Sequence, residues 1–151
     1  MMEGSSMDIA GFIGEKMGIE KKDIKTYSPL AFAYIGDEIY DLIVRTAVVL
    51  EGNIPVNRMN AHTAKLVRAS AQAKAADRLV ESGILSEKES DMYRRGRNAN
   101  SKTMAKNASV ADYRKATGLE ALVGYLYLGG EFNRAVEIVR LAISEDKIGG
   151  E

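Results

Sequence analysis

The stretch LAFAYIGDEIYDLIV (residues 30–44) decides the fold of this chain, together with a second apolar stretch, ATGLEALVGYLYLGG (residues 116–130). Both stretches are typical of helices at the centre of a fold, yet each contains a carboxylate. Asp37 lies in the first, and Glu120 is the only charged residue of the second. Burying an ionised carboxylate costs several kcal/mol unless something pairs with it. A shared divalent cation, bound by carboxylate oxygens and several waters, would explain both residues at once.

The composition is that of a single globular domain in a reducing compartment. The 151 residues suffice for one hydrophobic core, and 46% hydrophobic with 28% charged residues is ordinary for such a domain. The absence of cysteine excludes disulfides and thiolate metal sites. No apolar run is long enough for a membrane span, and the N-terminal MMEGSSMDIAG lacks the features of a signal peptide. We therefore expect a cytoplasmic protein without membrane contact.

Caps and apolar periodicity predict an all-α fold without strands. Ser28-Pro29 is a typical helix start, Ser86 and Glu89 form a capping box, and double glycines end the second apolar stretch. Between these signals the apolar residues recur at helical spacing. The expected elements are a short helix at 8–18, a long helix at 29–51, one helical stripe at 55–83 capped by Asn57, a short helix at 86–95, a polar loop at 96–108, and helices at 109–128 and 131–144.

Each carboxylate also has a purely structural interpretation. Asp41 lies four residues before Arg45, so these two are expected to form an ion pair along the helix. Asp37 has no basic partner close in sequence before Arg45, so its structural interpretation is a buried aspartate that is paired elsewhere in the fold. Its neighbour Gly36 costs about 1 kcal/mol in a helix interior and needs a packing reason. A core glutamate paired with an arginine would explain Glu120 without a metal, and Arg45 is the candidate partner. The sequence alone leaves both interpretations open.

Basic residues are concentrated in the middle of the chain, although the formal net charge is zero. Between residues 58 and 115, thirteen Lys and Arg stand against six Asp and Glu, which indicates either a polyanion-binding surface or a solvated helix face. The densest part, YRRGRNANSKTMAKNASVADYRK (93–115), combines arginines for bidentate phosphate contact with Asn, Ser and Thr that can reach phosphates and ribose hydroxyls. The predicted RNA-binding residues are Arg94, Arg95, Arg97, Asn98, Asn100, Lys102 and Lys106, with His62, Lys65 and Arg68 on the preceding helix.

Taken together, two carboxylates beside a one-sided basic surface are the parts of a metal-dependent phosphodiesterase, and the same residues resemble the ribonuclease III family. AYIGDEIYDLIVR (33–45) resembles the signature helix of this family, and TGLEALVGYLYLGG (117–130) resembles its second acidic helix. SAQAKA (70–75) and RGRNA (95–99) fit the Mini-ribonuclease III group, whose members are stand-alone nuclease domains. We therefore expect an N-terminal extension at 1–26, a ribonuclease III-like catalytic domain at 27–146, and no double-stranded-RNA-binding domain.

The resemblance implies a homodimeric, Mg²⁺-dependent endoribonuclease that cleaves double-stranded RNA, with maturation of large-subunit (23S) ribosomal RNA as the task of the group. Asp37 falls on the catalytic aspartate of the family and Glu120 on its catalytic glutamate, and both are expected to bind the metal. Two further acidic positions are occupied by Ala33 and Thr117 here. The metal shell is therefore expected to hold more waters, and Thr117 to reach the metal through one of them. A ribosomal protein could serve as helper, but the sequence identifies none.

Two other functions compete with the enzyme. A catalytically silent member of the same fold would act as an RNA-binding structural component, although the retention of both Asp37 and Glu120 argues against it. A helical protein-interaction module would pair its carboxylates with Arg45 and would bind no RNA. Mg²⁺-dependent cleavage of duplex RNA distinguishes the enzyme from the silent component, and RNA binding at low salt distinguishes both from the interaction module.

Overall fold

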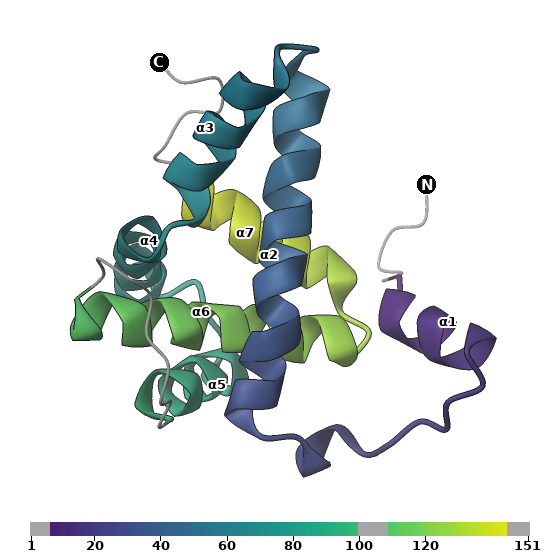
Figure 1. The fold of residues 1–151 in the computed structure, drawn as a ribbon. Coiled ribbons are helices and arrows are strands. Elements are labelled where there is room, and N and C mark those ends of the chain that lie inside the picture. The colour runs from purple at the N-terminus through teal and green to yellow at the C-terminus, as the bar shows by residue number, and fades with distance from the viewer. Residues whose placement is uncertain (1–6, 100–108, 145–151) are drawn as a thin grey trace.

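The computed structural model describes residues 7–99 and 109–144, which form helices packed around a central helix, α6. Figure 1 shows α2 crossing α6, with α4 and α5 beside α6 and α7 behind the crossing. The described residues contain no strand, so the predicted all-α fold is confirmed. The elements are α1 (Ile9–Lys16), the 3-10 helix η1 (Ile24–Thr26), α2 (Pro29–Glu51), α3 (Val56–Val67), α4 (Ala69–Ser82), α5 (Glu87–Asn98), α6 (Val110–Leu128) and α7 (Phe132–Ile143).

Helix α6 is buried on nearly every side because its sequence is apolar almost throughout. Leu119, Leu122 and Val123 are each at most 1% exposed. Helix α2 packs Tyr40 and Val44 into the same core, where they are also at most 1% exposed. Burying one such side chain stabilises the fold by roughly 1.5–3 kcal/mol. The two stretches that decide the fold in the sequence therefore form its central crossing.

The predicted helix starts that depend on local caps are confirmed. The Ser28 hydroxyl accepts a hydrogen bond from the Ala31 amide at 3.1 Å, at the start of α2. The Ser109 hydroxyl does the same for Asp112 at 3.0 Å, at the start of α6. Each cap satisfies an amide that has no partner within the first turn of its helix.

The helical stripe predicted at 55–83 is two helices, so that prediction is wrong at one point. The chain breaks at Arg68, whose ψ of 157° is extended, and α4 leaves α3 in a new direction. The Gln72 side chain donates to the Val67 carbonyl at 2.8 Å, which satisfies an acceptor freed by the break. Asn57 lies inside the first turn of α3 and is not its cap, because the N-cap position is Pro55 and carries no side-chain hydrogen bond.

The predicted polar loop is shorter than expected at its start. Helix α5 continues through residues 96–98 and ends at Asn98, beyond the predicted end near Arg95. The reason is packing, since Gly96 lies directly against α6, where an added Cβ would come within 2.6 Å of the Ala121 side chain. The remainder of the loop, 100–108, lies outside the described residues.

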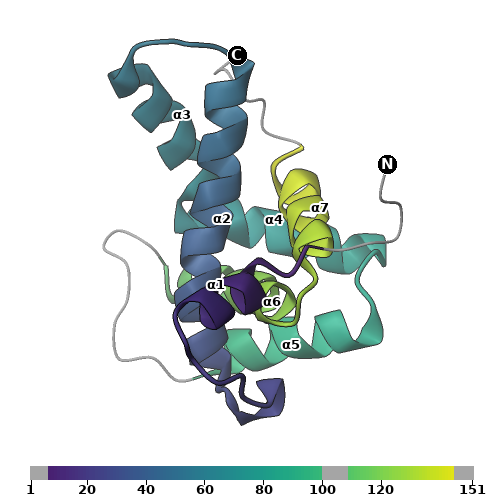
Figure 2. The ribbon, with the colours of Figure 1, turned by 90° about the vertical axis from the view of Figure 1, so that its right-hand side faces the viewer.

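The N-terminal segment places α1 beside the turn that joins α6 and α7 (Figure 2). Asp8 caps α1 by accepting a hydrogen bond from the Gly11 amide at 2.9 Å. The Asp8 carboxyl also lies beside Gly130, where an added Cβ would be 3.4 Å from Asp8 Cγ. Among residues 7–99 and 109–144, no helix is both long and apolar enough to cross a membrane.

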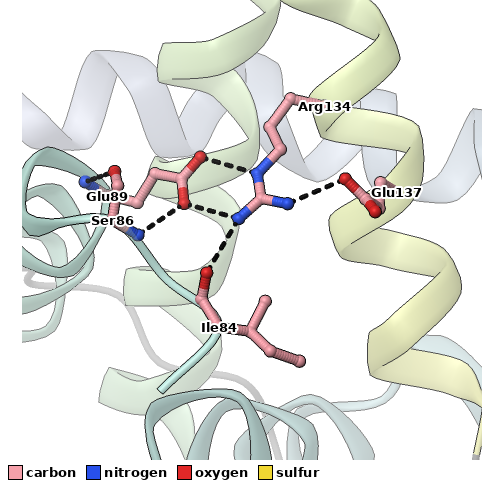
Figure 3. Close-up of polar contacts among 5 residues, drawn as sticks. All are labelled: Ile84, Ser86, Glu89, Arg134 and Glu137. Atoms are coloured by element: carbon pink, nitrogen blue, oxygen red, sulfur yellow. Dashed lines mark hydrogen bonds and ion pairs between the residues drawn. The ribbon is translucent and has the colours of Figure 1, made fainter. Parts of the chain in front are cut away.

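A partly buried ion pair joins the start of α5 to α7 (Figure 3). The Arg134 guanidinium donates to both carboxylate oxygens of Glu89, at 2.8 and 2.9 Å, and to the Ile84 carbonyl at 3.0 Å. It also reaches Glu137 at 2.7 Å. Glu89 closes the predicted capping box as well, because it accepts from the Ser86 amide at 2.9 Å. One carboxylate therefore fixes both a helix start and a helix–helix contact.

Candidate active site

The crossing of α2 and α6 brings Asp37 and Glu120 together. The helices approach so closely that a Cβ added to Gly36 would lie 1.7 Å from the backbone oxygen of Glu120. A Cβ added to Gly124 would lie 1.9 Å from the backbone oxygen of Phe32. Only glycine fits at these two contacts. The close contact at Gly36 explains why a glycine stands inside this helix, and it places the next residue, Asp37, beside Glu120.

The two carboxylates differ in exposure. Asp37 is exposed, so the expectation that both carboxylates lie inside the core is wrong for this residue. Glu120, on α6, is half-buried. Burial raises the pKa of Glu120 to about 8, with further contributions from the negative charge of Asp37 and from a hydrogen bond with it. Glu120 therefore carries a proton in the metal-free protein at neutral pH.

No basic side chain in the described part of the chain forms an ion pair with either carboxylate. The structural interpretation required Arg45 as the partner of Glu120, but Arg45 donates instead to Asp41 at 2.7 Å. The predicted ion pair between these two residues is therefore confirmed, and the alternative that neutralises Glu120 with Arg45 is wrong. Asp37 and Glu120 form a site with excess negative charge.

A third residue, Gln72, belongs to this site and was missed in the sequence. Its side chain is 3% exposed and donates to Glu120 Oε2 at 3.2 Å as well as to the Val67 carbonyl. Its own oxygen, Oε1, is buried without a hydrogen-bond partner among the described residues. One signal could have revealed it, because Gln72 interrupts the apolar stripe of α4 that includes Ala76 and Leu79.

The residues present suit a hard divalent cation. Two carboxylates without a cation and an orphaned amide oxygen supply oxygen ligands and negative charge, which Mg²⁺ prefers. No cluster of three or more His, Cys, Asp or Glu that could hold a metal occurs in the described ranges. The protein therefore offers few direct ligands, and the remaining ones would be waters and substrate oxygens, as Mg²⁺ sites commonly have.

The two non-acidic positions of the site, Ala33 and Thr117, are both 8% exposed. Thr117 lies three residues before Glu120 on α6, and its hydroxyl donates to the Tyr113 carbonyl at 3.0 Å. The hydroxyl proton is thus used within the helix, while the oxygen can still accept a hydrogen bond.

The predicted RNA-binding residues fall into three groups. Lys65 and Arg68 are exposed, His62 is half-buried, and Arg68 stands at the α3–α4 break next to the carbonyl that Gln72 contacts. The second group is on α5, where Arg94 and Arg95 are exposed and Arg94 is paired with Asp91. Also on α5, the Arg97 guanidinium lies over the Tyr93 ring, 5.7 Å from its centroid, and donates a hydrogen bond to the side chain of Asn98. The third group, Asn100, Lys102 and Lys106, lies outside the described residues.

Not all of these residues surround the carboxylates. Arg94 and Arg95 line a hollow of about 710 Å³ that also involves Phe32 and Tyr125, and neither Asp37 nor Glu120 lines it. Arg68 directly follows Val67, whose carbonyl accepts a hydrogen bond from the Gln72 side chain that also contacts Glu120. The site is thus bordered by α3 and α4 on the side of Gln72.

Comparisons with known proteins agree with this geometry. A family model of the ribonuclease III domain matches residues 30–131, which include both carboxylates. The chain belongs to the ribonuclease III family. It is 45% identical to the Mini-ribonuclease 3 of Thermoanaerobacter sp. (strain X514), over 94% of this chain and 96% of that protein. It is 41% identical to the Mini-ribonuclease 3 of Clostridium tetani, over 88% of this chain and 86% of that protein.

A solved structure is similar as well. The crystal structure of a Fusobacterium nucleatum protein matches with a TM-score of 0.73 and 28% sequence identity, over 84% of this chain and 100% of that chain. The predicted family, all-α fold and class of enzyme are confirmed. The chain is a ribonuclease III-type endoribonuclease that is similar over nearly its whole length to proteins named Mini-ribonuclease 3. Members of this family typically depend on Mg²⁺.

Proposed function

We propose that Asp37 and Glu120 together bind Mg²⁺ and that phosphodiester hydrolysis takes place at this pair. The observation that carries the proposal is the α2–α6 crossing, which holds two carboxylates side by side with no basic partner in the described residues. When bound, Mg²⁺ supplies Lewis-acid polarisation of the scissile phosphate and a lowered pKa for the attacking water.

The two carboxylates have different tasks in this proposal. Asp37 is exposed, so it is the residue that meets the solvated ion and the RNA phosphate first. Glu120 sits deeper and must release its proton before it can act as a ligand, since its pKa lies near 8. Thr117 acts through a water, because its hydroxyl proton is already donated to the Tyr113 carbonyl. The glycine contacts of α2 and α6 keep the pair rigid.

The basic residues hold the duplex. We propose that Arg68 and Lys65 contact phosphates beside the site, because Arg68 adjoins the carbonyl that anchors Gln72. Arg95 and Arg97 form a second contact region on α5, continued by Asn98. Because these contacts are made by basic side chains to phosphates, the affinity should be strongly salt-dependent. A ribosomal protein that presents the precursor RNA would raise the affinity for RNA.

A homodimer is the proposed assembly. Helix α2 leaves large apolar side chains exposed in the single chain: Tyr34 is 82% exposed, Leu42 52% and Leu50 79%. Exposed apolar residues of this size on a central helix favour association. Sedimentation of the wild type and of Tyr34→Asp and Leu50→Asp variants tests the assembly; a monomeric wild type would contradict it.

The proposed domain division is an N-terminal extension at 1–26 and a catalytic domain at 27–146, in the cytoplasm where ribosomal RNA is processed. One assay tests the enzymatic proposal. A duplex RNA with labelled ends is incubated with and without Mg²⁺, and the product ends are mapped. Cleavage of both strands that occurs only when Mg²⁺ is present supports the enzymatic proposal. Binding without cleavage would favour the silent RNA-binding component.

A further inference from the structure

The Gln72 amide is held in one orientation by its two donor contacts. A carbonyl oxygen can only accept, so the Val67 carbonyl at 2.8 Å requires the nitrogen of the amide to face it. The second hydrogen of the same nitrogen points to Glu120 Oε2, at 3.2 Å. Both donors are therefore used, one on the backbone of α3 and one on the carboxylate of α6.

The oxygen of this amide has no partner. Gln72 Oε1 is buried and accepts no hydrogen bond within the described ranges. An unsatisfied buried polar atom is destabilising, and native proteins rarely keep one without a reason. Because Oε1 and Nε2 share one carbon atom, this acceptor lies within a few ångströms of Glu120.

A glutamine that served only the helix break would need the Val67 contact alone. The additional contact, at 3.2 Å to Glu120 Oε2, is the one that joins Gln72 to the carboxylate pair. A neutral amide that donates to a carboxylate ligand fixes the orientation of that ligand without neutralising its charge.

On the basis of the proposed function, we propose that Gln72 is a positioning residue of the metal site. Its Nε2 fixes one oxygen of Glu120 and leaves the second for the ion. Residues that orient metal ligands in this way typically contribute 10–100-fold to metal affinity or activity.

The test is Mn²⁺ binding in the absence of RNA, measured by electron paramagnetic resonance as free against bound ion. Gln72→Met keeps the size of the side chain and removes its polar atoms. It should lower Mn²⁺ affinity about 10-fold or more and raise the half-saturating Mg²⁺ concentration for cleavage by a similar factor. Gln72→Glu keeps the shape of the side chain but replaces Nε2 with an oxygen, so it loses both donor contacts and should lower Mn²⁺ affinity as well.

The matched control is Arg78→Met on the same helix. Arg78 also donates to a backbone carbonyl, that of Ala142, at 2.6 Å, but it contacts neither carboxylate of the site. The control should lose stability and keep wild-type Mn²⁺ affinity. A merely structural role of Gln72 predicts the same result for Gln72→Met.

Mn²⁺ affinity at or above the wild-type value in either variant would overturn the inference. If Gln72→Met does not fold, the Gln72→Glu measurement decides alone, because it preserves the shape of the side chain. A wild-type protein that neither binds Mn²⁺ nor cleaves RNA would instead contradict the proposed function itself, so the two failures are distinguishable.

Discussion

Glu89 and Glu120 are glutamates in two regions of one molecule, and their surroundings are opposite. Glu89 is 7% exposed and accepts hydrogen bonds from Nε and Nη2 of Arg134, and this contact lowers the pKa of Glu89 despite its burial. Among the described residues, the polar groups beside Glu120 are the neutral amide of Gln72 and the negative Asp37, and its pKa rises to about 8. The chain neutralises the first glutamate internally, and in the proposed function the second binds an external cation.

This difference separates a structural carboxylate from a functional one. Breaking a buried ion pair leaves a charge without a partner and costs stability. A carboxylate pair that already lacks its cation loses nothing on neutralisation, so substitutions there should cost activity and gain stability.

The largest effect is expected at the site itself. Asp37→Asn and Glu120→Gln should each lower the cleavage rate by roughly 10³-fold or more, because each removes a charged ligand of the proposed ion. RNA binding should persist. The matched control is Glu38→Gln, which changes an exposed acid adjacent to Asp37 and should leave the rate unchanged. Single-turnover cleavage of a duplex RNA at saturating Mg²⁺ measures all three variants, and near-wild-type rates in both site variants would refute the assignment.

The next effect is the loss of the structural pair. Arg134→Met should lower the free energy of unfolding by about 3–5 kcal/mol, because it leaves Glu89 buried without its partner. The control, Arg45→Met, breaks an ion pair whose arginine side chain is 58% exposed and should cost less than about 1 kcal/mol. Urea unfolding at pH 7 compares them. Equal losses of unfolding free energy in the two variants would mean that the ion pair of Arg134 and Glu89 does not stabilise the fold.

The two glutamates should affect the pH dependence of stability with opposite sign. Glu120 has a raised pKa, so the unfolded chain ionises from about pH 4.5 while the folded chain stays protonated until about pH 8. Its contribution to stability therefore falls as the pH rises through this window. Glu120→Gln should accordingly be more stable than wild type by ~1–3 kcal/mol at pH 8 and by little at pH 4.5, measured by urea unfolding in EDTA. A constant difference between these pH values would contradict the raised pKa.

Glu89 has a lowered pKa, so its stabilisation is present above about pH 4.5 and is lost as the pH falls through its folded value. Glu89→Gln should thus lose most stability relative to wild type near pH 6 and least near pH 3. A loss that is the same at both pH values would show that the charge of Glu89 is not what Arg134 recognises.

The smallest effect is expected at the basic surface. Arg68→Ala and Arg95→Ala should each weaken RNA binding by a few-fold and reduce the salt dependence of the binding constant by about one phosphate contact. Arg45→Ala is the control, because this arginine is already paired with Asp41. Binding titrations in Ca²⁺ or EDTA at several salt concentrations give both quantities. An unchanged salt dependence would place that residue outside the RNA interface.

The sequence predicts the features of this fold that depend on near neighbours. Ser28-Pro29, the capping box of Ser86 and Glu89, and the Ser109 cap are visible because each partner lies within a few residues. The ion pair of Asp41 and Arg45 is visible for the same reason. The resemblance of the two acidic helices then supplied the family.

Features that depend on distant partners were not predictable from the pattern. The break at Arg68 falls inside an unbroken apolar stripe, and no local breaker marks it. Gln72 meets Glu120 across 48 positions of sequence, and Arg134 meets Glu89 across 45. The exposure of Asp37 likewise follows from the angle at which α2 crosses α6, which periodicity does not specify.

The most direct test of the central claim is the number of protons released when a divalent ion binds. Isothermal titration of Mn²⁺ into the RNA-free protein, repeated in buffers of different ionisation enthalpy, gives this number. Because the pKa of Glu120 lies near 8, binding should release close to one proton per ion at pH 7 and almost none at pH 9.5. Glu120→Gln should abolish the release. Ion binding to the wild type without proton release at pH 7 would contradict the claim that Glu120 is protonated before the cation binds.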